Sequence, residues 1–267
     1  MTTACPTGDP WVRRFHPAPD ASARLVCFPH AGGSATFYFP LSAALRGTAD
    51  VVAVQYPGRQ DRHAEKGIET IAELADRAHE ALQPYADRPL TFFGHSMGSI
   101  VAFEVARRFE RDGEGPVHLF ASARRAPSAY AGENVHQRDD DGIIAEMRRL
   151  SGTDARLLDD EEIVRMILPA LRSDYTAVET YRATPSTVIS TPITALTGDT
   201  DPRVTPEEAH AWRAHTTGTF DLRIFPGGHF YLSEQIPELS ELLRARLTGR
   251  SRDQPVPASC YPSSLGP

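Results

Sequence analysis

The chain has 267 residues, of which 40% are apolar and 24% charged, as in an ordinary soluble globular domain. Acidic residues outnumber basic ones by 35 to 28, and a net charge of −7 argues against nucleic-acid binding. No apolar run approaches the roughly 20 residues that span a bilayer, and no secretory signal is visible. The three cysteines (Cys5, Cys27 and Cys260) form neither a disulfide framework nor a metal-binding pair, so we expect a cytoplasmic protein without a metal.

Short apolar runs predict the strands of one sheet. Each run is apolar almost throughout, which is typical of a strand buried on both faces of a parallel sheet. Helical patterns lie between them, so the alternation predicts an α/β fold with a mostly parallel sheet and helices on both faces. The predicted strands are 24–29, 51–55, 90–94, 117–122, 193–197 and 222–225, and the predicted helices are 71–82, 99–111, 207–215 and 236–247.

One long segment, residues 124–192, interrupts this alternation. It contains no convincing strand but three helical stretches, at 143–150, 163–171 and 173–181, and the acidic run 139–141 reads as the start of the first. An insertion of this kind predicts a helical lid over the carboxyl edge of the sheet, where ligands bind in open α/β sheets.

The two ends of the chain differ from the domain between them. The first twenty residues are expected to lie along the surface, pinned by Trp11 and Phe15. The Pro- and Ser-rich residues 251–267 predict a disordered tail. A single domain is therefore predicted for residues 1–250.

The most specific motif is Gly-His-Ser-Met-Gly at residues 94–98, between the predicted strand 90–94 and a predicted helix. This is the setting of a nucleophile elbow, in which a sharp turn lifts a serine hydroxyl to the top of the sheet. The turn is so tight that a side chain at either glycine would collide with neighbouring backbone. Ser96 is therefore the predicted nucleophile.

A nucleophilic serine needs a histidine base and a carboxylate that orients it, and both follow later strands in this type of fold. His229 leaves the strand 222–225 through two glycines, which predicts that its ring can reach Ser96. Asp199 and Asp201 both follow the strand 193–197 and compete for the carboxylate role. Asp201 is favoured because it stands further past the strand end, next to a proline.

Two backbone amides are expected to bind the developing oxyanion. One belongs to Met97, which follows the nucleophile, and the other to Ala31 in the Gly-rich loop after the first strand. The neighbouring loop 56–62 carries Arg59 and Arg62, which could contact a phosphate or pair with acids such as Asp61 and Glu65. Pairing is favoured, since surface arginines usually find carboxylates.

Taken together, these residues resemble the stand-alone type II thioesterases of polyketide and nonribosomal peptide pathways, which have the α/β-hydrolase fold. The resemblance covers residues 11–250. It rests on six motifs: FPHAGGS at 28–34, QYPGR at 55–59 with Arg62, GHSMG at 94–98, RSDY at 172–175 with ETY at 179–181, GDTDP at 198–202 and GGHF at 227–230.

The resemblance implies hydrolysis of acyl groups from the phosphopantetheine thiol of carrier proteins, which clears stalled assembly lines. It implies Ser96, Asp201 and His229 as the catalytic triad, Ala31 and Met97 as oxyanion donors, and a mobile lid at 124–192. It implies no cofactor, and we expect a monomer that contacts carrier proteins but neither nucleic acid nor membrane.

Four further residues are candidates for contact with substrate or lid, namely His30, Tyr175, Arg124 and Arg125. The last two could form a basic patch on which an acidic carrier protein docks. Alternatives remain: an esterase or acyltransferase could use the same triad, because the pocket chooses the leaving group and acceptor. A catalytically silent binding protein is the further alternative, although it would have no need of a complete triad.

Overall fold

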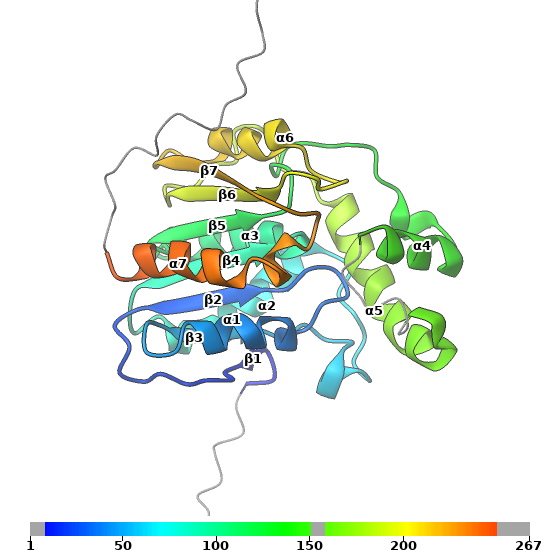
Figure 1. Ribbon diagram of the computed structural model, residues 1–267, viewed down its shortest axis with the longest axis horizontal. Coiled ribbons are helices and arrows are strands. Elements are labelled where there is room, and N and C mark those ends of the chain that lie inside the picture. The colour runs from blue at the N-terminus through cyan, green and yellow to red at the C-terminus, as the bar shows by residue number, and fades with distance from the viewer. Residues whose placement is uncertain (1–8, 151–157, 250–267) are drawn as a thin grey trace, which may run out of the picture.

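The computed structural model describes residues 9–150 and 158–249. They form a seven-stranded sheet with the spatial order β1-β3-β2-β4-β5-β6-β7, in which only β1 runs antiparallel to its neighbour (Figure 1). The strands are β1 Val12–Arg13, β2 Arg24–Phe28, β3 Asp50–Val54, β4 Leu90–His95, β5 His118–Ser122, β6 Ile193–Gly198 and β7 Phe220–Phe225.

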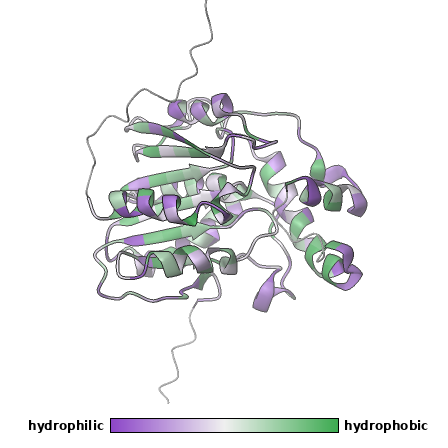
Figure 2. Ribbon diagram, in the orientation of Figure 1, coloured by the Kyte–Doolittle hydropathy of each residue, from purple (hydrophilic) through white to green (hydrophobic). Residues whose placement is uncertain are grey.

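Every residue of β2 to β6 is buried, which explains why these strands are largely apolar (Figure 2). The edge strand β7 is partly exposed. Successive side chains point to opposite faces, so Val26 joins one apolar cluster and Cys27 the other. Burial raises the pKa of the Cys27 thiol, which is a core residue as expected.

Helices cover both faces of the sheet. One face packs against α2 (Ile71–Leu82) and α3 (Met97–Arg111), and the other against α1 (Phe39–Ala44) and α7 (Ile236–Leu247). The short helix α6 (Pro206–His210) lies beside β6 and β7. Short 3-10 helices include Ala35–Tyr38, Gln60–Arg62, Gln83–Tyr85, Val135–Gln137, Ala211–His215 and Tyr231–Ser233.

The insertion between β5 and β6 forms α4 (Asp140–Leu150) and α5 (Glu161–Thr180), which lie together at one end of the sheet (Figure 1). The prediction of separate helices at 163–171 and 173–181 is wrong, because α5 is continuous through both. Residues 171–173 contain no helix breaker, and Pro169 lies inside the helix without ending it. The acidic first turn of α4 is confirmed.

The predicted strands and the helices outside the lid are confirmed, with ends that shift by up to two residues, except where 207–215 divides into α6 and a 3-10 helix. Within the N-terminal segment, residues 9–20 do lie at the surface, where β1 pairs with β3 and Trp11 contacts Tyr56. Phe15 packs against Phe39. The predicted tail at 251–267 lies outside the described residues.

Candidate active site

The turn between β4 and α3 has the strained geometry of a nucleophile elbow. Ser96 has φ 53° and ψ −119°, a conformation that non-glycine residues rarely adopt. A Cβ at Gly94 would lie 2.3 Å from the carbonyl oxygen of Gly98, and a Cβ at Gly98 would lie 2.0 Å from that of Phe28. Both glycines are therefore required by close backbone contacts, and the turn presents the Ser96 hydroxyl at the carboxyl edge of the sheet.

His229 lies between Ser96 and Asp201. Its Nε2 is 3.0 Å from the Ser96 hydroxyl, and its Nδ1 is 2.9 Å and 3.0 Å from the two carboxylate oxygens of Asp201. The side chains of His229 and Asp201 are almost fully buried. With Nδ1 donating to Asp201, Nε2 is left as an acceptor for the serine proton, which is the arrangement that general-base chemistry requires.

Asp199, the competing carboxylate, points elsewhere. It is exposed and accepts a hydrogen bond from the backbone N–H of Gly227 at 2.8 Å. This contact joins the turn after β6 to the turn that carries His229. The structure thus places Asp201 against His229, while Asp199 links the two turns through its hydrogen bond to Gly227.

Ala31 and Met97 line one small cavity together with Ser96 and His229. Met97 is the first residue of α3, and the first amides of a helix have no intrahelical acceptor. The free volume of the cavity is about 20 Å³, which is enough for one water molecule but not for an acyl chain.

A second cavity of about 50 Å³ adjoins the first, with which it shares His30, Ala31 and Tyr175 among its lining residues. Its outer wall is formed by Met147 and Leu150 of α4. The inserted helices α4 and α5 therefore border the space beside Ser96, which in this structure is too small for an acyl chain.

His30 is half-buried among aromatic rings beside this space. Its ring lies edge-on to Phe37 and Phe230, with centroids 4.6 Å and 4.8 Å away. Desolvation lowers the pKa of His30 to about 3, and electrostatic repulsion from His229 and Arg59 acts in the same direction. The His30 ring is thus neutral at physiological pH and shapes the mouth of the cavity as an uncharged wall.

Tyr175 lies on the roof of both cavities, projecting from α5. Burial raises the pKa of Tyr175 to about 12, so the phenol stays protonated. The guanidinium of Arg203 lies 5.6 Å from the centre of its ring.

Arg124 and Arg125 do not form the exposed basic patch that the docking hypothesis requires. Their side chains are only 11% and 8% exposed, and both pair with Glu133. Arg124 lines the cavity that contains Ser96, and Arg125 also pairs with Glu208 of α6. The docking hypothesis is corrected on this point, because the chain folds back at 124–133 and covers both guanidinium groups.

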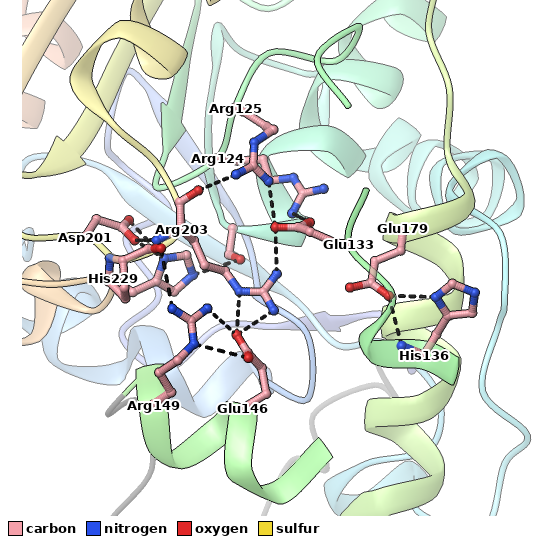
Figure 3. A network of polar contacts seen from close by, with 12 residues as sticks. Arg124, Arg125, Glu133, His136, Glu146, Arg149, Glu179, Asp201, Arg203 and His229 are labelled. Carbon is pink, nitrogen blue, oxygen red and sulfur yellow. Dashed lines mark hydrogen bonds and ion pairs between the residues drawn. The ribbon is translucent and has the colours of Figure 1, made fainter. Parts of the chain in front are cut away.

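Arg203, which the sequence analysis did not single out, connects Asp201 to the lid (Figure 3). Its backbone N–H donates to Asp201 Oδ1 at 2.8 Å, and its side chain donates to Glu146 of α4 at 2.6 Å and 2.8 Å. Arg149 also pairs with Glu146, at 2.6 Å. The only sequence signal was a basic residue two positions after the triad carboxylate.

Arg59 and Arg62 pair with acids, as the sequence analysis favoured. Arg62 pairs with Glu65 at 2.6 Å. Arg59 pairs instead with Asp174, a residue 115 positions away that no local pattern connects to it.

Residues 9–150 and 158–249 show neither a metal-binding cluster nor a membrane-spanning helix. They contain no group of three or more His, Cys, Asp or Glu side chains arranged to hold a metal ion. None of the helices in these ranges is long and apolar enough to cross a membrane.

Comparisons with known proteins agree with this geometry. The profile of the thioesterase domain family matches residues 23–247. The chain is 55% identical to the probable cadicidin biosynthesis thioesterase of Streptomyces griseus over 236 residues, which cover 88% of this chain and 65% of that protein. It is 52% identical to thioesterase PikA5 of Streptomyces venezuelae, covering 86% and 82% of the two chains.

A solved structure is similar over nearly the whole domain. The type II thioesterase BorB from the borrelidin biosynthetic cluster superposes with a TM-score of 0.84 at 50% identity, covering 90% of this chain and 98% of that one. The seven-stranded sheet with its helical lid is therefore the α/β-hydrolase fold of type II thioesterases.

Proposed function

The chain belongs to the thioesterase domain family, and we propose that it hydrolyses acyl thioesters from the phosphopantetheine arm of carrier proteins, as an editing enzyme of a polyketide or nonribosomal peptide assembly line. The observation that carries the proposal is the hydrogen-bonded row of Ser96, His229 and Asp201 beneath a helical lid. Support for the substrate class comes from the pathway-associated relatives and from BorB.

The first half of the reaction transfers the acyl group to the enzyme. His229 Nε2 takes the proton of the Ser96 hydroxyl while the serine oxygen attacks the thioester carbonyl carbon. The amides of Ala31 and Met97 donate to the resulting oxyanion, and Asp201 stabilises the imidazolium. Collapse of this intermediate breaks the carbon–sulfur bond, and the imidazolium returns its proton to the departing thiol.

The second half releases the acid. Water enters the site, His229 takes one of its protons, and the hydroxide oxygen attacks the acyl carbon of the ester on Ser96. The same two amides hold the second oxyanion. Its collapse breaks the bond to Ser96, which regains a proton from His229. Nucleophile, base and oxyanion donors all belong to the chain, so the proposed reaction needs no cofactor.

The small volume of the cavity beside Ser96 supports a role for the lid in substrate selection. Its free volume is too small for an acyl chain, so Met147 and Leu150 of α4 are expected to move when substrate binds. A closed lid also keeps bulk water from the acyl-enzyme. We propose that the enzyme acts as a monomer in the cytoplasm, with carrier proteins as its partners.

The test uses a series of acetyl-, propionyl- and longer acyl-carrier proteins, followed by intact-mass spectrometry. Wild-type protein is expected to restore the free carrier thiol, and Ser96→Ala is expected to lose this activity by about 10⁵-fold or more. Asp199→Asn serves as a folded control with activity near wild type. Matching free esters form the second arm: their cleavage with carrier substrates left intact would replace the proposal with an esterase.

A further inference from the structure

The helix α5 supports the loop that carries Ala31. The carboxylate oxygen Oδ2 of Asp174, on α5, accepts a hydrogen bond from the backbone N–H of Gly32 at 2.7 Å. Leu171, one turn earlier, packs directly on Gly32, where an added Cβ would lie 2.4 Å from the leucine Cδ2. Gly32 has φ +73°, a left-handed backbone conformation that favours glycine. The Leu171 side chain also leaves no room for a Cβ at this position.

The other oxygen of Asp174 pairs with Arg59. The distance from Oδ1 to Arg59 Nη2 is 2.9 Å, and Arg59 Nη1 donates to the carbonyl oxygen of Gly33 at 3.4 Å. The two side chains are only 1% and 6% exposed. One buried ion pair therefore holds the peptide groups on either side of the Gly32–Gly33 link, one through a donor and the other through an acceptor.

A third contact fixes the far end of the same loop. The side-chain oxygen of Gln55 accepts from the backbone N–H of Ala35 at 2.8 Å, and its amide nitrogen donates to the carbonyl of Arg59 at 3.3 Å. Arg59 is thus tied to the loop by its backbone as well as by its side chain. At the other end of the loop, next to Ala31, the hydrogen bond from Gly32 to Asp174 has the corresponding role.

We propose that Asp174, with Arg59 as its counter-ion, is a positioning residue that orients the loop 30–33 so that the Ala31 amide faces the oxyanion. The inference rests on the proposed function, because it takes Ala31 as an oxyanion donor. Gly32 and Gly33 have few conformational restraints of their own, so an external anchor is needed to hold the peptide planes. Charge-assisted hydrogen bonds to buried partners supply such an anchor.

The surroundings of Asp174 make its protonation state measurable. Desolvation raises the pKa of Asp174 to about 6, although the Arg59 charge and the Gly32 amide lower it. Arg59 and the phenol of Tyr56 are the ionisable groups that face the carboxyl from the loop after β3. The carboxylate and its ion pair are therefore present at pH 7.5 and are lost as the pH falls below 6.

The main test compares Asp174→Asn with wild type on an acyl-carrier substrate. At pH 7.5 we expect kcat to fall by about 10- to 100-fold with KM within about threefold, because the lost interaction acts on the transition state. The difference should shrink at pH 5.5, where the wild-type carboxyl is itself protonated. Phosphonylation of Ser96 by a fluorophosphonate, whose phosphoryl oxygen occupies the oxyanion site, should slow in parallel.

Two further variants separate positioning from folding. Arg59→Met with Asp174→Leu replaces the ion pair by apolar side chains, a change that often preserves stability. We expect a Tm near wild type but a kcat still reduced about 10-fold or more. Arg59→Lys keeps the counter-charge and loses one donor, so a smaller decrease of about three- to tenfold is expected.

Thr176→Ala is the matched control, since among the described residues its hydroxyl donates only to the carbonyl of Arg172 within α5. It should keep wild-type kcat. The inference is overturned if either the double variant or Arg59→Lys folds with wild-type Tm and keeps kcat within twofold. It is also overturned if the Asp174→Asn deficit is the same at pH 5.5 and 7.5. Activity that survives Ser96→Ala would instead remove the proposed function.

Discussion

Two carboxylates of the lid insertion, Glu146 on α4 and Asp174 on α5, are both buried but are held in opposite ways. Glu146 pairs with Arg203, Arg149 and Arg138 (Figure 3 shows the first two). Arg149 and Arg203 outweigh desolvation and lower the pKa of Glu146 to about 2. Asp174 has one arginine, and desolvation raises its pKa to about 6. The two pKa values shift in opposite directions because Asp174 is the more deeply buried of the two and has fewer cationic partners.

The two attachments also differ in how easily they can be released. Arg149 and Arg138 are 45% and 41% exposed, so water can replace part of the Glu146 network. The Asp174 pair is enclosed, and the part of α5 around it packs into the core. We therefore expect α4 to open the cavity while this part of α5 stays fixed to the oxyanion loop.

Among the variants that test this comparison, the largest effect on kcat is expected at Asp201. Its carboxylate accepts from the backbone of Arg203, whose side chain pairs with Glu146. Asp201→Asn should lower kcat by about 10⁴-fold, because an amide no longer holds His229 in the tautomer that accepts the serine proton. Steady-state hydrolysis of an acyl-carrier substrate measures this. Asp199→Asn, two residues away, should stay within about threefold, and equal losses in the two variants would contradict the assignment of Asp201.

A smaller effect distinguishes the two lid carboxylates by stability. The pKa of Glu146 is lower in the folded chain than its ordinary value, so its contribution to the unfolding free energy is present above about pH 4.5 and is lost toward pH 2. Glu146→Gln should cost about 2 kcal/mol at pH 7 and progressively less at pH 3. Urea unfolding at the two pH values measures the difference.

Asp140→Asn is the control for that experiment, because this exposed acid on the same helix pairs with Arg172 at the surface. Its cost should stay below about 1 kcal/mol. The pH dependence of the Asp174 contribution has the opposite sign. Because its pKa is raised in the folded chain, its contribution to the unfolding free energy falls as the pH rises from about 4 to about 6. If Glu146→Gln lowers the unfolding free energy by the same amount at pH 7 and pH 3, the proposed difference between Glu146 and Asp174 is wrong.

The smallest expected effect on stability is at Arg149, a partly exposed partner of Glu146. Arg149→Ala removes a half-exposed partner and leaves Arg203 in contact with Glu146. We expect a loss of about 0.5 kcal/mol, which a thermal melt detects as a small fall in Tm. If Arg149→Ala lowers the unfolding free energy as much as Glu146→Gln does, then Arg149, and not the buried Arg203, holds α4 in place.

The sequence predicted the sheet and the elbow because their signals are local. A continuous apolar run identifies a buried strand, and the glycines around Ser96 belong to one pentapeptide between a strand and a helix. The sequence order of Ser96, Asp201 and His229 likewise follows the order of the strands that carry them. Their meeting could therefore be predicted without knowing any side-chain contact.

The supports around the site could not be predicted in the same way. Asp174 lies 142 residues from Gly32, and Glu146 lies 57 residues from Arg203, so neither pair leaves a local pattern. Two adjacent arginines at 124 and 125 resemble an exposed patch until the fold brings Glu133 onto them. Ion pairs between distant segments depend on how the lid packs, which no periodicity reveals.

The central claim is that Ser96 carries the acyl group during carrier-protein deacylation, and trapping that intermediate tests it most directly. Wild-type protein is mixed with acyl-carrier protein, quenched in acid within the first turnovers, and analysed by intact-mass and peptide mass spectrometry. The account predicts an added acyl mass on the peptide that contains Ser96, which disappears as free acid forms and is absent in Ser96→Ala. Carrier deacylation that proceeds without this adduct and survives Ser96→Ala would contradict it.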